Sequence, residues 1–361
     1  MLISHRYSFE HIEDVWPVLC HRPHGVRKVA IHPQIRDCKI FGAVTPGRRN
    51  HIHFHHPLSH GTADETEAFE QALSLARNNA APSSILVVCP EFPRKFPDYQ
   101  KTYDELLVAQ TKTSIRSAKA ALTLDEGSVD ISIELLSAKT PATKIDQYVL
   151  RQNHDLVIKE AEPRDGDGRD FKAIDLDLLR KCPCALWLCR PIAYSRQLIK
   201  VAVAIDPDSA EEAVEDLSIR MLRLSRALTD SCSSEMHIIS CWDCEFEFYL
   251  RSNAWVKIPD AQIAEADGGT QQEHRRALQR LIKASGISGN HKVHHLRGQA
   301  EEPIPSFVEN NKVDILVMGT VGRTGLLGFL IGNTAENIVE KISCSLLVRK
   351  PPRFVSPVKA Y

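Results

Sequence analysis

The stretch "GTVGRTGLLGFLIGNT", residues 319–334, follows the apolar run "VDILVM" and leads into "TAENIVEKI", where apolar residues recur at helical spacing. The sequence therefore predicts a strand, a glycine-rich loop and a helix in succession. Gly319 ends the strand, and Gly332, Asn333 and Thr334 begin the helix. Because a helix N-terminus offers partial positive charge and unpaired backbone N–H groups, this arrangement favours phosphate. A plain glycine-rich turn is the alternative that the glycines alone leave open.

The loop matches neither of two common nucleotide-binding motifs. It lacks the Gly-Lys-Ser/Thr of a Walker A loop. A dinucleotide fingerprint belongs after the first strand of a domain, where this sequence reads "AIDPDSAEE" without glycine. The glycine loop therefore indicates a different kind of phosphate site.

The chain repeats itself at a shift of about 160 residues. The matched pairs are "KCPCALWLCRP" (181–191) with "ISCSLLVRKP" (342–351), "HDLVI" (154–158) with "VDILV" (313–317), and "KIFGAVTP" (39–46) with "KVAVAIDP" (200–207). A chain of 361 residues also exceeds the length at which one core usually keeps growing. We therefore expect an N-terminal extension of unknown structure and two copies of one domain, at residues 1–37, 38–192 and 198–352.

Each copy alternates β-rich runs with segments of helical spacing, which is typical of parallel sheets covered on both faces. The predicted fold class is α/β, with two tandem Rossmann-like domains. Each is an open, mostly parallel five-stranded sheet with helices on both faces. In such sheets, ligands bind at the carboxyl ends of the strands, where the strand order reverses.

The spacing of Gly319, Gly322 and Gly332, followed by Asn333 and Thr334, resembles the ATP-binding motif Gly-x2-Gly-x9-Gly-Ser/Thr of the universal stress protein family. The segments "GNTAE" and "LLRKCPCALWLCRP" are similar to those of the tandem, E-type bacterial members. The resemblance covers nearly all of residues 38–352 and is stronger in the second half. It implies an adenine nucleotide, either ATP or AMP/ADP, with Mg²⁺ as an optional companion.

The family also carries an Asp after the first strand, and Asp206 in "AVAIDPDS" stands there. The resemblance implies that Asp206 contacts the ribose or adenine; a helix N-cap is the alternative. It further implies that the three glycines line the phosphate loop. Asn333 replaces the usual Ser or Thr, so the hydroxyl moves to Thr334, and either side chain can bond phosphate. Arg323 is a further phosphate ligand, or else a solvated loop arginine.

The two halves are not equivalent. In the first copy, Thr45 takes the position of Asp206, and Lys159 that of Gly319, before the acidic "KEAEPRDGDGRDFKAIDLDLLRK". Carboxylates there would repel a triphosphate unless a metal bridged them. We expect the first half to have lost nucleotide binding and to be structural. The family's domains pair through their last strands, which implies intramolecular pairing here; a homodimer is a further arrangement left open.

Histidines and cysteines supply the remaining candidates. "HIHFHHPLSH" reads as a loop that binds Zn²⁺, Ni²⁺ or Cu²⁺, or as an exposed polar loop with incidental affinity. Its histidines are His51, His53, His55, His56 and His60. "CWDC" (241–244) and "KCPC" (181–184) read as structural. Of His294 and His295, alternation predicts one in the core and one on the surface.

A net charge of −1 provides no basic field for nucleic acid. No apolar stretch reaches the roughly 20 residues of a membrane span, and the charged N-terminal stretch lacks a signal-peptide core. With the cysteines read as reduced thiols, the expected location is cytoplasmic. No catalytic constellation is recognisable. The leading hypothesis is a nucleotide-binding stress-response regulator. The alternatives are an interaction scaffold without nucleotide and a slow ATPase or phosphotransferase using the same pocket.

Overall fold

The computed structural model describes most of the chain after the first 65 residues. The described residues are 5–7, 29–31, 50–54, 66–78, 81, 83–89, 97–161, 173–192, 198–208, 212–232, 234–243, 259–320, 332–351 and 354–361. In the part before residue 50, β1 (His5–Tyr7) pairs in parallel with β2 (Val29–Ile31).

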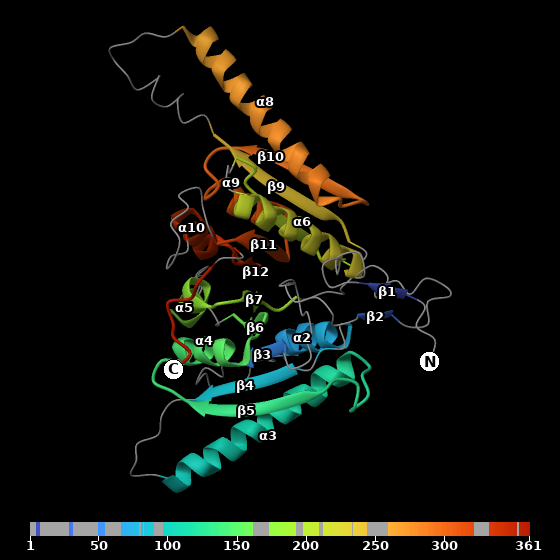
Figure 1. Ribbon diagram of the computed structural model, residues 1–361, viewed down its shortest axis with the longest axis vertical. Helices are drawn as coiled ribbons and strands as arrows, with labels where there is room; N and C mark the ends of the chain where they lie inside the picture. Colours follow the sequence, from blue (N-terminus) through green and yellow to red (C-terminus); the bar gives the residue numbers. More distant parts are fainter. Residues whose placement is uncertain are drawn as a thin grey trace.

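Among the described residues, two successive sets of alternating strands and helices follow (Figure 1). The first set comprises β3 (Asn50–Phe54), α2 (Thr66–Asn78), β4 (Ser83–Cys89), α3 (Pro97–Ala121), β5 (Ile131–Ser137), α4 (Pro141–Gln152), β6 (Leu156–Glu160), α5 (Ala173–Lys181) and β7 (Ala185–Cys189). The second comprises β8 (Val201–Ala204), α6 (Glu212–Cys232), β9 (Met236–Trp242), α8 (Asp260–Ser285), β10 (His291–Arg297), α9 (Pro303–Asn311), β11 (Ile315–Gly319), α10 (Asn333–Lys341) and β12 (Ser345–Arg349). The predicted α/β repeat is confirmed.

The second half forms a doubly wound sheet with the strand order β10-β9-β8-β11-β12, and all neighbouring pairs are parallel. The chain moves outward from β8 to β10, then returns to the other side of β8 to form β11 and β12. The strand order therefore reverses between β8 and β11. In open sheets of this kind, that reversal is where ligands bind.

The first half follows the same order, β5-β4-β3 and then β6-β7, but its hydrogen-bonded ladder is interrupted. β3 and β6 are neighbours, yet among the described residues they belong to separate sheets (Figure 1). Residues 39–46, which the repeat aligns with the first strand of the second half, fall outside the described residues. The strand beside β4 is instead β3, at Asn50–Phe54. Ile52 and Phe54 alternate with histidines there, which is a strand pattern that the run of histidines obscured.

The sheet is buried on both faces, which explains the continuous apolar runs in its central strands. Successive residues of β11 enter different cores: Val317 lies in the core covered by α2, α3, α6 and α8, and Leu316 in the core covered by α4, α5, α9 and α10. Both cores continue through the two halves. Helices therefore cover both faces, as predicted.

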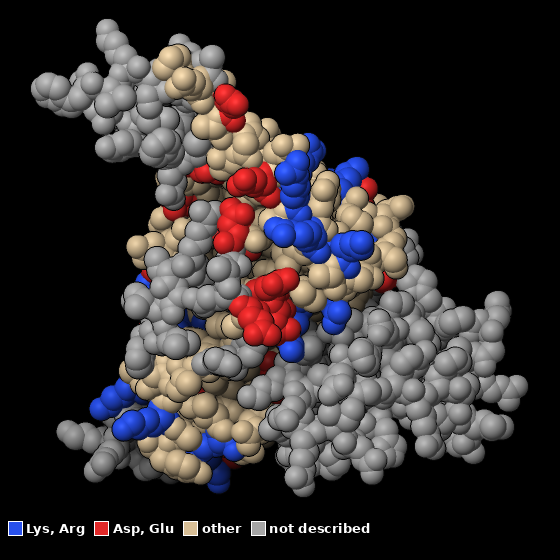
Figure 2. Space-filling view, turned by 45° about the horizontal axis from the view of Figure 1, so that its top comes forward, with Lys and Arg blue, Asp and Glu red and all other residues tan. Residues whose placement is uncertain are grey.

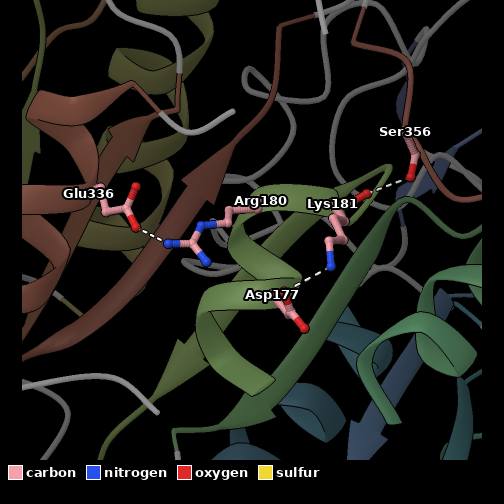
Figure 3. Close-up of polar contacts among 5 residues, drawn as sticks. All are labelled: Asp177, Arg180, Lys181, Glu336 and Ser356. Carbon is pink, nitrogen blue, oxygen red and sulfur yellow. Dashed lines mark hydrogen bonds and ion pairs between the residues drawn. The ribbon is translucent and has the colours of Figure 1, made fainter. Parts of the chain in front are cut away.

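The two halves join through their last strands, since β12 pairs with β7 in antiparallel fashion to give one seven-stranded sheet. Side chains reinforce the junction (Figure 3). Arg180 of α5 forms an ion pair with Glu336 of α10. Ser356, beyond β12, returns to the first half, where its Oγ donates to the carbonyl oxygen of Lys181 at 2.6 Å. The expectation that the repeats pair within one chain is confirmed.

Candidate functional site at the reversal of strand order

Asp206 and Gly319 lie at the carboxyl ends of the two strands that flank the reversal. β8 and β11 pair in parallel, with Val203 opposite Val317. Asp206 follows β8 by two residues, and Gly319 is the last residue of β11. The sheet therefore brings these two positions, 113 apart in numbering (319 − 206), to one edge. This is the edge at which doubly wound sheets bind ligands.

The carboxylate of Asp206 is half-buried and takes part in a tight local turn. Its Oδ1 accepts a hydrogen bond from the backbone N–H of Asp208 at 3.1 Å. The described part of helix α6 begins at Glu212, and residues 209–211 before it fall outside the described residues, so the N-cap alternative for Asp206 stays open. Burial, followed by the nearby charge of Asp206, raises the pKa of the Cys241 thiol to about 12. This thiol stays protonated and unreactive at neutral pH.

The two ends of the glycine loop, at Thr320 and Gly332, are joined by a backbone hydrogen bond. The backbone N–H of Gly332 donates to the carbonyl oxygen of Thr320 at 3.0 Å. Thr320 is buried, and its hydroxyl has no hydrogen-bond partner among the described residues. Gly322 and Arg323 fall outside the described residues. The sequence analysis passed over Thr320, although it stands second in "GTVGR"; a hydroxyl directly after a strand end was the available signal.

Helix α10 starts at the loop's end with its first turn open. Its N-cap, Gly332, has an extended backbone (φ −60°, ψ 144°), and among the described residues no side chain caps it. Asn333 and Thr334 are exposed there. Because the first backbone N–H groups of a helix lack intrahelical partners, this end can bind an anion. Glu336, in the first turn of α10, forms an ion pair with Arg180 of the other half.

Gly319 has a packing role that the sequence analysis did not anticipate. A Cβ added to Gly319 would lie 3.2 Å from Cδ2 of Leu217 and 3.8 Å from Met221. Both residues belong to α6 and lie in the core. The missing side chain therefore allows α6 to pack closely on β11, so a bulky residue at this position should disturb the packing of the fold.

The corresponding edge of the first half contains a buried ion pair. Nζ of Lys159 lies 2.8 Å from Oδ1 of Asp175, with the two side chains 2% and 0% exposed. Aligning the last residues of β6 and β11 places Glu160 at the position of Gly319 and Lys159 at that of Met318. The assignment of Lys159 to the position of Gly319 was thus one residue out. Thr45 lies outside the described residues.

The other histidine and cysteine predictions have mixed outcomes. His51 and His53 lie in β3 rather than in a loop, whereas His55, His56 and His60 fall outside the described residues. Cys241 and the five other cysteines whose side chains the structure describes are free thiols, as expected.

His294 and His295 do point to opposite faces, but both are half-buried, so the prediction of a surface histidine is wrong. His294 Nε2 lies 3.0 Å from His237 Nδ1, and His295 Nε2 lies 2.8 Å from His274 Nδ1. Burial lowers the pKa of His237 and of His294.

On the face shown in Figure 2, acidic and basic side chains lie side by side over the described residues. This mixture fits the net charge of −1, which argued against a nucleic-acid partner. None of the helices that the structure describes is long and apolar enough to cross a membrane.

The fold and its edge define a class: two doubly wound α/β domains in tandem, joined through their last strands, with a glycine loop leading into a helix in the second. The sequence matches the Universal stress protein family at residues 58–190 and again at residues 200–350. The chain belongs to the universal stress protein family, and its two consecutive family domains make it a tandem, E-type member.

Similar proteins agree with this assignment. Universal stress protein E of Escherichia coli strain K12 is 29% identical over 73% of this chain and 81% of its own length. Universal stress protein E of Photorhabdus laumondii is 29% identical over 65% of this chain and 74% of its own length. In fold, a protein of unknown function from Pseudomonas aeruginosa PAO1 matches with a TM-score of 0.61, 20% identity and coverage of 84% and 93% of the two chains. A universal stress protein from Archaeoglobus fulgidus matches with a TM-score of 0.56, 14% identity and coverage of 83% and 98%.

Proposed function

We propose that the second half binds one adenine nucleotide, which is ATP, ADP or AMP, and that the protein acts as a cytoplasmic stress-response regulator. The observation that carries the proposal is the meeting of Asp206, Gly319 and the open N-terminus of α10 at the reversal of strand order. An acidic acceptor suits ribose or adenine N–H and O–H donors, and a helix N-terminus suits phosphate.

The remaining site residues take roles that their chemistry allows. Asn333 and Thr334 bond phosphate oxygens from the exposed first turn of α10. Gly322 and Arg323 complete the loop, with the guanidinium pairing with phosphate. The buried hydroxyl of Thr320 is a further group that a bound phosphate or its water would satisfy. Mg²⁺, if present, would neutralise the phosphates, because it prefers oxygen ligands and usually keeps several waters.

Titration calorimetry of the full chain with ATP, ADP and AMP tests the proposal. We expect one site per chain. Asp206→Ala should weaken affinity by about 1.5–3 kcal/mol, the usual value for a hydrogen bond to a charged group. Thr334→Ala should weaken it by about 0.5–1.5 kcal/mol, the value for a neutral hydrogen bond.

Thr113→Ala is the matched control for the threonine variant. Thr113 is exposed, and its hydroxyl donates to the carbonyl of Ala109 within helix α3 of the first half, so nucleotide affinity should not change. Absence of binding by all three nucleotides would overturn the proposal in favour of a scaffold. Two equivalent sites per chain would overturn the assignment to the second half alone.

A further inference from the structure

A second cluster of chemically active side chains lies beside the reversal of strand order, on the side away from β11. Asp206 and Asp208 follow β8, and His274 lies on α8. One ligand atom from each of the three lies within 4.8 Å of the others. His274 Nε2 and Asp208 Oδ2 are 3.7 Å apart. The three residues come from two elements that are 66 positions apart (274 − 208) in the sequence.

These separations suit a metal ion. Zn²⁺ bonds of about 2.0–2.1 Å in tetrahedral geometry place neighbouring ligand atoms about 3.3 Å apart. The 3.7 Å between His274 Nε2 and Asp208 Oδ2 is within a small side-chain adjustment of that value, and the ligand atoms all lie within 4.8 Å of one another. The backbone also orients one of the two carboxylates, because the N–H of Asp208 donates to Asp206 Oδ1.

His295 holds the imidazole ring of His274 in place through a hydrogen bond to its Nδ1. His274 is 2% exposed, and its Nδ1 lies 2.8 Å from Nε2 of His295 on β10. If Nδ1 carries the proton and donates to His295, Nε2 is left as the metal-binding atom facing the carboxylates. Metal-bound histidines characteristically use the second nitrogen in this manner. His295 is in turn stacked on Trp242, with the rings inclined by 14°.

We propose that Asp206, Asp208 and His274 form a site for a divalent transition metal, with Zn²⁺ as the best fit, and that His295 positions His274. Imidazole favours Zn²⁺ over Mg²⁺ or Ca²⁺, and two carboxylates neutralise its charge. Three protein ligands leave one position open at the exposed Asp208 side, which is the pattern of reactive rather than structural zinc sites. The proposal goes beyond nucleotide binding and does not depend on it, although the metal site shares Asp206 with the proposed nucleotide site.

The test uses the full chain, stripped with a chelator, in the absence of nucleotide. Zn²⁺ is titrated against a chromophoric competitor, so that the number of sites and their affinity are both measured. Asp208→Asn and His274→Gln should each weaken one tight site more than about 100-fold, because loss of even an outer partner costs roughly 10–100-fold. Weak sites elsewhere, including those of the histidines in residues 51–60, should be unchanged.

Two controls match the ligand variants. Asp216→Asn changes an aspartate on α6 that pairs with Arg220, and His291→Gln changes a histidine of β10 outside the cluster. Both should bind Zn²⁺ like the wild type. His274 is buried and its variant could unfold, whereas Asp208 is exposed, so Asp208→Asn keeps the test decisive. Equal site number and affinity in wild type and Asp208→Asn, or no tight site in the wild type, would overturn the proposal.

Cobalt gives an independent reading of the ligands. Co²⁺ in the tight site should show visible bands typical of nitrogen and oxygen ligands, and these should disappear in Asp208→Asn. Sulfur-to-metal charge-transfer bands would instead assign the tight site to cysteines and overturn the proposal. His295→Phe should weaken Zn²⁺ binding about 10–100-fold without lowering metal-free stability, and His295→Gln, which restores an acceptor, should recover part of the loss. Loss of stability alone would make His295 merely structural.

Discussion

Trp187 of β7 lies directly opposite Leu347 of β12 in the antiparallel pair that joins the two halves. Both side chains are almost fully buried, and both belong to the core covered by α2, α3, α6 and α8. At this pair, both the β-sheet and one hydrophobic core are continuous across the boundary between the repeats. The first half thus buries apolar surface for the second, which gives a physical reason for a tandem chain to retain it.

The first prediction concerns this junction. Trp187→Ala should lower the free energy of unfolding by about 3–5 kcal/mol, because it leaves a large cavity beside Leu347. Urea denaturation of the nucleotide-free protein measures the change. Leu198→Ala, at a leucine that is 63% exposed, should change stability by less than about 0.5 kcal/mol. Equal effects of the two substitutions would show that the junction contributes little.

The second prediction concerns the buried pair of Lys159 and Asp175. Asp175→Ala leaves the lysine charge buried without its ion-pair partner, and this should cost about 3–5 kcal/mol of stability. The second half suggests a compensated alternative. Since α5 and α10 have the same length, Asp175 corresponds to Ala335, and Lys159 corresponds to Met318.

The double variant Lys159→Met with Asp175→Ala therefore installs the pair that the second half already buries. Replacing a buried ion pair by apolar residues is often neutral or stabilising by about 1–4 kcal/mol. We expect the double variant to be at least as stable as the wild type in thermal and urea unfolding. A double variant as unstable as Asp175→Ala would indicate that the ion pair contributes net stability.

Sequence patterns predicted those features that depend on residues close together in the chain. Helical and strand periodicities gave the order of elements, and the match between "HDLVI" and "VDILV" gave the repeat. The first strand of the first half was misplaced because "KIFGAVTP" resembles "KVAVAIDP", whereas β3 is rich in histidine. The apolar residues of "KIFGAVTP" drew the prediction to that segment, because the histidines of β3 obscure its alternation of polar and apolar residues.

Features that depend on the direction in which a side chain points, or on contacts between residues far apart in the sequence, could not be predicted in this way. The Gly319 loop was found from its spacing, but which way a Cβ there would point depends on how α6 packs, and local pattern does not report this. The approach of Asp208 to His274 requires that α8 fold back over β9 and β10. Similarly, nothing near Lys159 in the sequence marks Asp175 as its buried partner.

The third prediction concerns pH. Burial raises the pKa of Asp146 on α4 from 3.8 to about 10, with Cys182 adding to the rise and Lys350 opposing it. A folded-state pKa above the unfolded value gives stability that is complete below pH 3.8 and lost progressively up to about pH 10. Burial lowers the pKa of Lys350 to about 8. This lysine therefore changes the pH dependence of stability only in the range from about pH 8 to pH 10.5.

Comparison with Asp146→Asn from pH 5 to 7.5 isolates Asp146, because Lys350 does not titrate there and the buried histidines contribute equally to both proteins. Relative to Asp146→Asn, a neutral mimic of the protonated acid, the wild type should lose stability as pH rises, with a slope approaching about 1.4 kcal/mol per pH unit. Urea unfolding of both proteins across this range measures the difference. Parallel pH profiles would mean that Asp146 is not held protonated in the fold.

The fourth prediction separates packing from ligand contact at Gly319. Gly319→Ala places a methyl group 3.2 Å from Leu217 Cδ2, closer than ordinary contact, so the Leu217 side chain must move by a few tenths of an ångström. Overpacking of this kind should destabilise the fold by about 1–3 kcal/mol. Leu217→Val, which shortens the side chain that meets the methyl, should be less harmful in the alanine background than in the wild type, as a double-mutant cycle would show.

The same variant bears on the nucleotide. Because the added Cβ faces α6, Gly319→Ala should weaken ATP binding less than Thr334→Ala does, even though it destabilises the fold more. Calorimetry at a temperature where each variant is fully folded compares the two affinities. A Gly319→Ala protein of normal stability that no longer binds ATP would reverse the assignment. In that case the missing side chain of Gly319 would make room for the ligand and not for helix α6. Helix α6 would then have to lie farther from β11 than the 3.2 Å distance between the added Cβ and Leu217 Cδ2 implies.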